Sequence, residues 1–152
     1  MKYYFSSLFL LLFFHSKITL AYDFSVDFTF LTDAGTADVM EFGDEMTVRH
    51  FTGTASWKDS TGDYGTLKCL GHYVSTKKNG TVLNNYCQGT NRDGNIFWLT
   101  MQRKSTDYDG GIGKSEYIYG DGKFKRYIGV KCIYAVEISK DFSILKQKCK
   151  KE

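Results

Sequence analysis

Two glutamates are the residues of this chain that are best suited to acid–base chemistry. Glu116 and Glu137 interrupt two runs that are otherwise rich in aromatic and β-branched residues. A carboxyl group that points into an apolar interior has a raised pKa and can act as an acid or a base, whereas on an outer face it only adds solubility. The sequence offers Glu116 and Glu137 as candidate site residues and leaves their direction open.

Aromatic residues form the second candidate set. The chain has 12 Phe, 11 Tyr and 2 Trp. One alternating set would line a pocket for an apolar small molecule, and Trp57, Trp98, Tyr117 and Tyr119 are the candidates for it. The alternative is that these rings simply pack a core, because an eight-stranded barrel is just wide enough either to fill itself or to hold one small ligand.

Other chemistries lack their usual residue patterns. Only His50 and His72 follow the first 21 residues, and the sequence has no H-x-H, H-x-x-x-H or C-x-x-C spacing. The acidic turns at residues 59–63, 91–95 and 107–111 do not complete a calcium loop, and no G-x-S-x-G motif is present. We therefore expect no metal site and no cofactor.

The first 21 residues have the features of a cleaved secretory signal. Lys2 precedes an apolar run at residues 3–14, and Thr19 and Ala21 are small residues at a suitable cleavage point. The run is too short to span a bilayer, which takes about 20 apolar residues, so no stable membrane insertion is expected. This pattern predicts a secreted or periplasmic protein, in which residues 22–152 form one domain.

The charge balance argues against a nucleic-acid-binding protein. Lys2 and Lys17 lie in the predicted signal, so 18 basic residues remain against 17 acidic ones. Such a near-neutral chain lacks the basic footprint of nucleic-acid recognition. The lysine-rich end, KQKCKKE, is interpreted as a solubility feature.

Four cysteines predict two disulfide bonds. Cys69 and Cys87 flank the turn signal TKKNG almost symmetrically, and Cys132 and Cys149 flank residues 139–142. Folding each segment as a hairpin brings its two cysteines opposite each other or one residue out of register. We expect the pairs Cys69–Cys87 and Cys132–Cys149.

Strand signals recur along the whole domain. Residues 23–31 alternate between apolar and polar side chains, and further β-rich runs are separated by turn sequences. About eight strands are expected, including two in the glycine-rich stretch, at residues 116–119 and 127–134. Proline is absent, and closure of the sheet would remove its edges. The predicted fold is all-β, a single closed antiparallel barrel with two hairpin disulfides.

The glycine-rich stretch GGIGKSEYIYGDGKFKRYIGVKCIY resembles the allene oxide cyclase and dirigent-like β-barrel group. The matching positions are Gly111, Gly113, Gly120, Gly122, Lys123, Phe124, Gly129 and Tyr134. Asp121 stands where that group usually has threonine. The resemblance implies an eight-stranded barrel with an apolar cavity that shapes a small-molecule reaction, and a homo-oligomer in some members. No catalytic residue of the group falls on a matching position.

Three functions follow as expectations. The first is a barrel that binds an apolar small molecule in its interior. The second is a cavity enzyme of the cyclase or isomerase kind, which would use Glu116 or Glu137. The third is an envelope or adhesion protein that acts through its outer face.

Overall fold

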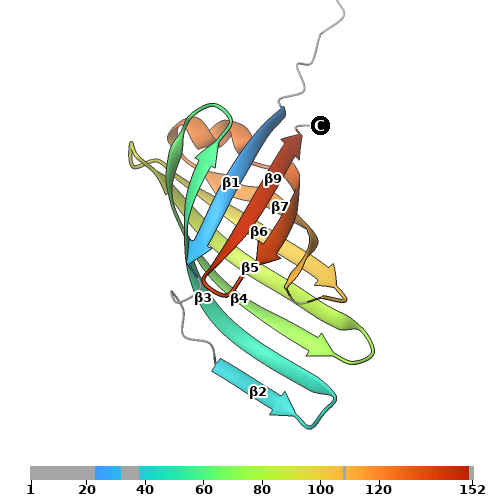
Figure 1. The fold of residues 1–152 in the computed structure, drawn as a ribbon. Coiled ribbons are helices and arrows are strands. Elements are labelled where there is room, and N and C mark those ends of the chain that lie inside the picture. The colour runs from blue at the N-terminus through green and yellow to red at the C-terminus, as the bar shows by residue number, and fades with distance from the viewer. Residues whose placement is uncertain (1–22, 32–37, 108, 151–152) are drawn as a thin grey trace, which may run out of the picture.

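The structure is a computed structural model that describes residues 23–31, 38–107 and 109–150. The predicted signal at residues 1–21 lies outside the described residues. Nine strands and one short 3₁₀ helix make up the described part (Figure 1). They are β1 (Asp23–Leu31), β2 (Asp38–Phe42), β3 (Met46–Asp59), β4 (Tyr64–Thr76), β5 (Gly80–Asn91), β6 (Ile96–Ser105), β7 (Gly110–Gly120), η1 (Gly122–Tyr127), β8 (Lys131–Ile138) and β9 (Phe142–Lys150).

Eight of the strands close into an antiparallel barrel, as predicted. The sheet runs in the order β1-β9-β8-β7-β6-β5-β4-β3-β2, and β1 also pairs with β3. The closing pairs run from Val26 opposite Asp59 to Phe30 opposite Ala55. The ninth strand, β2, lies outside the closed wall and pairs with the first part of β3.

Alternation along the strands decides which side chains enter the barrel. In β1, Phe24, Val26 and Phe28 are buried, while Asp27 and Thr29 face water. A pleated strand points successive side chains to opposite faces, so this pattern gives each strand one apolar inner face. The inner faces together form one continuous core cluster.

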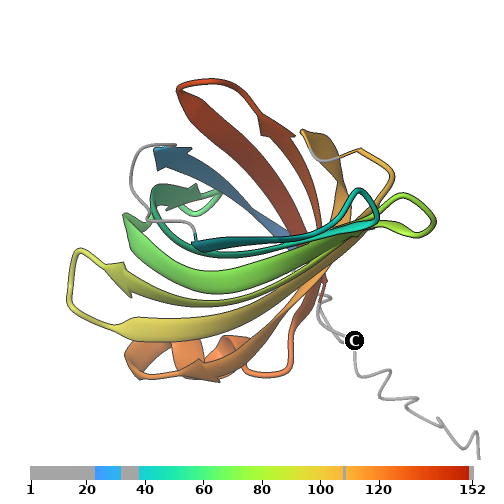
Figure 2. The same cartoon turned by 90° about the horizontal axis from the view of Figure 1, so that it is seen from below.

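The barrel wall is taller on one side than on the other. β3, β4 and β5 have 14, 13 and 12 residues, whereas β1, β8 and β9 have 9, 8 and 9. The long strands continue past the short ones, and β2 joins them there (Figures 1 and 2). We call this end the open end, and the opposite end, where η1 lies, the helix end.

The glycine-rich stretch differs from its prediction. The first strand is longer than expected, because β7 spans Gly110–Gly120. The predicted second strand begins instead as η1, and β8 starts only at Lys131. Phe124 and Tyr127 are three residues apart and both buried, and a 3₁₀ helix places such residues on one side. Helix η1 thus turns two aromatic rings into the core.

Both predicted disulfides are present. Cys69 lies directly opposite Cys87 on β4 and β5, and Cys132 lies directly opposite Cys149 on β8 and β9. All four side chains point inward and are buried. Disulfides of this kind are typical of proteins from an oxidising compartment.

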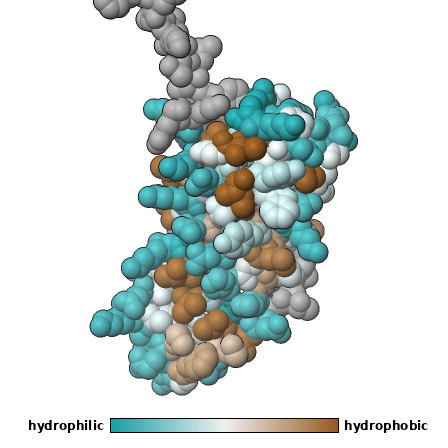
Figure 3. All heavy atoms as spheres, turned by 180° about the vertical axis from the view of Figure 1, so that it is seen from behind, coloured by the Kyte–Doolittle hydropathy of each residue, from teal (hydrophilic) through white to brown (hydrophobic). Residues whose placement is uncertain are grey.

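The outer surface carries apolar side chains between polar ones. On the face seen in Figure 3, the hydrophobic residues form separate patches among hydrophilic neighbours. Among the described residues, no helix is long and apolar enough to cross a membrane.

Candidate functional site

Two of the predicted pocket residues are part of the packed core at the helix end. Trp57 and Tyr117 are 4% and 2% exposed. The Trp57 ring meets Phe97 edge-on at 5.3 Å, and its indole N–H donates to the Thr66 carbonyl at 3.1 Å. Phe97 in turn contacts Phe124 of η1 at 4.8 Å. These rings pack directly against one another.

A glycine completes the packing at the helix end. A Cβ atom at Gly89 would lie 2.1 Å from the Phe97 ring. The ring therefore occupies the place where any other residue would put its side chain. The helix end of the barrel is solidly packed.

Trp98 and Tyr119 lie on the outside of the barrel, away from Trp57 and Tyr117. They are 45% and 46% exposed, and their rings meet edge-on at 6.1 Å. Trp98 faces outward by alternation, because its neighbours Phe97 and Leu99 are buried. Tyr119 faces outward because of a β-bulge: Leu99 pairs with Tyr117 whereas Trp98 pairs with Tyr119, which leaves Ile118 as an extra residue on β7. A bulge reverses the inside–outside pattern beyond it. The four aromatic residues therefore do not line one pocket.

Glu116 and Glu137 also face outward. Glu116 is half-buried on the outer wall and Glu137 is exposed. Their strand neighbours Ser115, Tyr117 and Val136 take the inward positions. The inward orientation that an acid–base role would require is therefore not found for either carboxylate.

The open end has a different inner surface from the helix end. Phe30, Phe51, Leu83 and Val136 occupy inward positions there and are only partly buried. Phe30 and Val136 pack against the edge of the core cluster. Partly exposed apolar side chains on an inner wall give this end the lining that small-molecule sites commonly have.

Polar groups with unused bonding capacity lie on the same wall. The Arg49 Nε and Asn85 Oδ1 atoms are buried and have no hydrogen-bond partner among the described residues. Phe51 pairs with Gly71, which pairs with Asn85, and Arg49 is two residues before Phe51 on the same face. The Arg49 guanidinium lies over the Tyr73 ring at 5.5 Å. A buried polar atom without a partner costs about 1–3 kcal/mol, so these two atoms require an explanation.

Tyr134 extends the polar part of this wall. Its ring covers Gly113, where a Cβ atom would lie 2.2 Å from the ring. Burial raises the pKa of the Tyr134 hydroxyl to about 12, and the nearby positive charge of Arg103 offsets part of that rise. Tyr134 therefore stays neutral at physiological pH and can act as a hydrogen-bond donor.

The acidic turns at the helix end are closed by a lysine. Asn91 donates to Asp63 at 3.2 Å, and the Lys123 ammonium lies 2.7 Å from Asp63 and 3.6 Å from Asp93. Within the described residues, no three His, Cys, Asp or Glu side chains form a group that could hold a metal ion. Lys123 thus supplies the positive charge that balances the carboxylates of Asp63 and Asp93.

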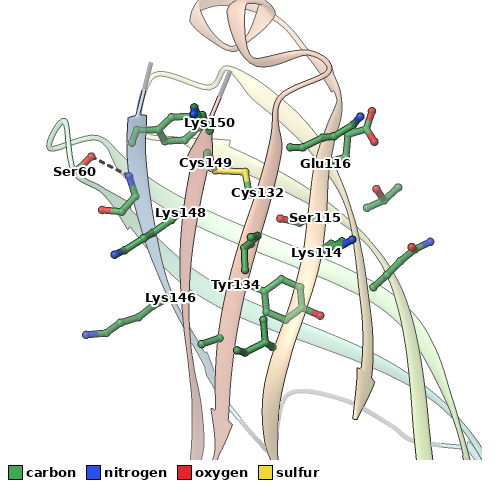
Figure 4. A pocket seen from close by; sticks show the side chains of 18 residues that line it. Ser60, Lys114, Ser115, Glu116, Cys132, Tyr134, Lys146, Lys148, Cys149 and Lys150 are labelled. Carbon is green, nitrogen blue, oxygen red and sulfur yellow. Dashed lines mark hydrogen bonds between the residues drawn. A yellow bond between two sulfur atoms is a disulfide. The ribbon is translucent and has the colours of Figure 1, made fainter. Parts of the chain in front are cut away.

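A second concave region lies on the outer face of β6–β9. This hollow has a volume of about 1280 Å³, and its lining includes five lysines and the predicted site residue Glu116 around Ile112, Ile133 and Ala135. Lys146, Lys148 and Lys150 follow one another along β9, and Lys114 extends from β7 (Figure 4). The fifth lysine, Lys131, lies directly opposite Lys150.

Neither region was predicted from the sequence. Arg49 is two residues before Phe51, so both side chains lie on the apolar inner face of the same strand. An inward arginine could have been inferred from that spacing. The five lysines come from three consecutive strands, and the antiparallel register of β7, β8 and β9 brings them together on one face.

The chain was also compared with known proteins. No family model and no curated protein matches it.

Proposed function

We propose that this protein is a secreted or periplasmic binding protein that holds a small, largely apolar molecule with an anionic end group in the open end of its barrel. The observation that carries the proposal is the inner wall at that end. It combines partly exposed Phe30, Phe51, Leu83 and Val136 with the Arg49 Nε and Asn85 Oδ1 atoms, which have no hydrogen-bond partner in the part of the chain that the structure describes.

The charge of Arg49 favours an anionic end group. A guanidinium is always protonated in proteins, and it binds carboxylates through short, charge-assisted hydrogen bonds. An anionic oxygen near Arg49 would satisfy the Nε donor. A ligand hydroxyl or a bridging water would satisfy the Asn85 acceptor. The ligand class that meets these needs is an amphipathic organic acid with an aliphatic or aromatic body.

The location within the barrel follows from packing. The helix end is filled by Trp57, Phe97, Tyr117 and Phe124, whose rings contact one another. The open end lies beyond this aromatic cluster, and there Tyr73, Thr81 and Arg103 are buried, whereas Phe30, Phe51, Leu83 and Val136 stay partly exposed. A ligand at this end would cover those side chains and gain about 25 cal/mol for each Å² of apolar surface removed from water.

Binding is preferred to the cyclase-like alternative for a specific reason. That alternative relied on Glu116 or Glu137 inside the barrel, and both carboxylates are on the outer wall. Tyr134 is the titratable group with a shifted pKa on the inner wall, and its value of about 12 makes it a poor base.

A fluorescence titration with dansyl-labelled undecanoic acid and its methyl ester tests the proposal. We expect the acid to bind with a one-to-one stoichiometry and more tightly than the ester. Arg49→Met should weaken binding of the acid by about tenfold and leave the ester unchanged, as expected for loss of one charge-assisted bond.

Arg92→Met is the matched control. It also removes one arginine, but Arg92 is an exposed residue at the helix end that lies over the Tyr64 ring. This variant should bind the acid as the wild type does. Equal affinity of the wild type for acid and ester, or no binding of either, would overturn the proposal.

A further inference from the structure

The five lysines of the outer hollow, Lys114, Lys131, Lys146, Lys148 and Lys150, form a positively charged surface that we call the lysine surface. All five side chains are exposed. Three acidic residues are cross-strand neighbours of these lysines: Glu116 lies opposite Lys131, Asp27 opposite Lys146 and Asp23 opposite Lys150. Among the side chains that the structure describes, which do not include that of Asp23, no ion pair within 4.0 Å involves any of the five lysines.

The five lysines outnumber the three acidic residues opposite them, so the surface keeps an excess of positive charge. Lys131 and Lys150 are direct cross-strand neighbours, and like charges in that position destabilise a sheet. Lys146, Lys148 and Lys150 project from the same face of β9 at intervals of about 7 Å. A bound anion would relieve the repulsion, and the concave shape strengthens the attraction because it focuses the field.

The shape of the lysine surface favours a chain-like partner. Ile133 and Ala135 lie in the hollow with the lysines around them. A flat bilayer would touch the rim of such a hollow and leave its floor uncovered. A flexible linear polymer can enter it.

The strand topology disfavours a peptide. Peptides that bind sheets commonly add a strand to an exposed edge, where their backbone groups find partners. β6, β7, β8 and β9 each have a paired strand on both sides, so the hollow offers no edge. A polysaccharide does not need one, because its hydroxyl groups can bond to Thr100, Gln102 and Ser25, which line the hollow.

A pair of exposed aromatic rings continues this surface. Trp98 precedes Thr100 by two residues and faces the same side, and its ring meets that of Tyr119. Exposed aromatic rings offer apolar faces that suit the C–H faces of sugar rings. We propose that the lysine surface and the Trp98–Tyr119 pair bind an acidic polysaccharide.

The test compares two variants with the same net charge. K131Q/K146Q/K148Q removes three lysines of the hollow, whereas K68Q/K78Q/K125Q removes three exposed lysines that do not line it. Calorimetric titration with a heparin oligosaccharide at about 0.15 M salt should show at least a tenfold loss of affinity in the first variant and less than a threefold loss in the second. Equal losses, or no binding by the wild type, would overturn the proposal.

Two further measurements separate a polysaccharide from other polyanions. Trp98→Ala should weaken binding of the oligosaccharide about fivefold and leave binding of poly-L-glutamate unchanged. The wild type should bind the oligosaccharide more tightly than poly-L-glutamate or single-stranded DNA of equal charge. Tighter binding of either competitor, or an unchanged affinity of Trp98→Ala for the oligosaccharide, would contradict the assignment to a polysaccharide.

Discussion

The Lys123 ammonium lies 2.7 Å from a carboxylate oxygen of Asp63, and this contact ties η1 to the turn between β3 and β4. Asp63 is 7% exposed, and Asn91 donates a second hydrogen bond to the same oxygen. The pair fixes η1 over the helix end, where Phe124 and Tyr127 complete the core. An electrostatic contact thereby supports the packing of two aromatic rings.

Asp63→Asn should destabilise the protein by about 1–3 kcal/mol at neutral pH, because it leaves Lys123 without its closest anion. Burial by itself raises the pKa of Asp63, but the hydrogen bonds from Lys123 and Asn91 and the charge of Lys123 outweigh burial and lower it. A lowered pKa in the folded state stabilises the fold above the ordinary value near 4, and this stabilisation is lost as pH falls. Denaturant unfolding as a function of pH measures the difference.

The wild type and Asp63→Asn should therefore converge in free energy of unfolding below about pH 4. Asp44→Asn, in an exposed turn, is the control and should follow the wild type throughout. A difference between wild type and Asp63→Asn that does not change with pH would contradict this account.

Tyr134 should make the fold sensitive to alkali. Its pKa is raised to about 12 by burial, so the folded state holds the proton more tightly than the unfolded state does. The wild type should lose up to about 3 kcal/mol relative to Tyr134→Phe as pH rises from about 10 to 12. Equilibrium unfolding by urea at each pH checks this prediction, with Tyr86→Phe at an exposed position as control. Parallel pH curves for all three proteins would refute it.

Gly89→Ala should destabilise the protein by about 1–3 kcal/mol, because the new Cβ atom would meet the Phe97 ring at 2.1 Å. Gly53→Ala is a matched control, since its Cβ atom would lie 3.6 Å from Phe30, an ordinary contact. That variant should change the free energy of unfolding by less than about 0.5 kcal/mol. The double variant Gly89→Ala/Phe97→Leu should cost less than the sum of its single changes. Additive costs would show that the two side chains do not share this space.

The two disulfide bonds predict how many free thiols the protein shows before and after reduction. The folded protein should show no free thiol before reduction and four after it. Cys132→Ala/Cys149→Ala should lower the free energy of unfolding by about 3 kcal/mol, because the bond closes a loop of 17 residues. Free thiols in the untreated protein would contradict the pairing.

The barrel and the disulfides could be predicted from the sequence because both depend on local patterns. Alternation in β1 places Phe24, Val26 and Phe28 on one face. Cysteines placed symmetrically about a turn meet in a hairpin, as Cys69 and Cys87 do. These signals need only the period of a strand and the position of a turn.

The outward direction of Tyr119 depended on a feature that a strand period does not contain. The extra residue Ile118 separates Tyr117, which points inward, from Tyr119, which points outward. No pattern of residue types marks that bulge. Helix η1 had a signal, the spacing of Phe124 and Tyr127, but the surrounding glycines favoured a tight turn.

We propose that the open end of the barrel binds an amphipathic acid. The most direct test of this binding is an NMR titration of methyl-labelled protein with undecanoate. We predict saturable shifts of the Leu83 and Val136 methyl signals, weaker in Arg49→Met, while Ile112 and Ile133 on the outer wall stay unmoved. Shifts confined to Ile112 and Ile133, or no change at Leu83 and Val136, would contradict the claim.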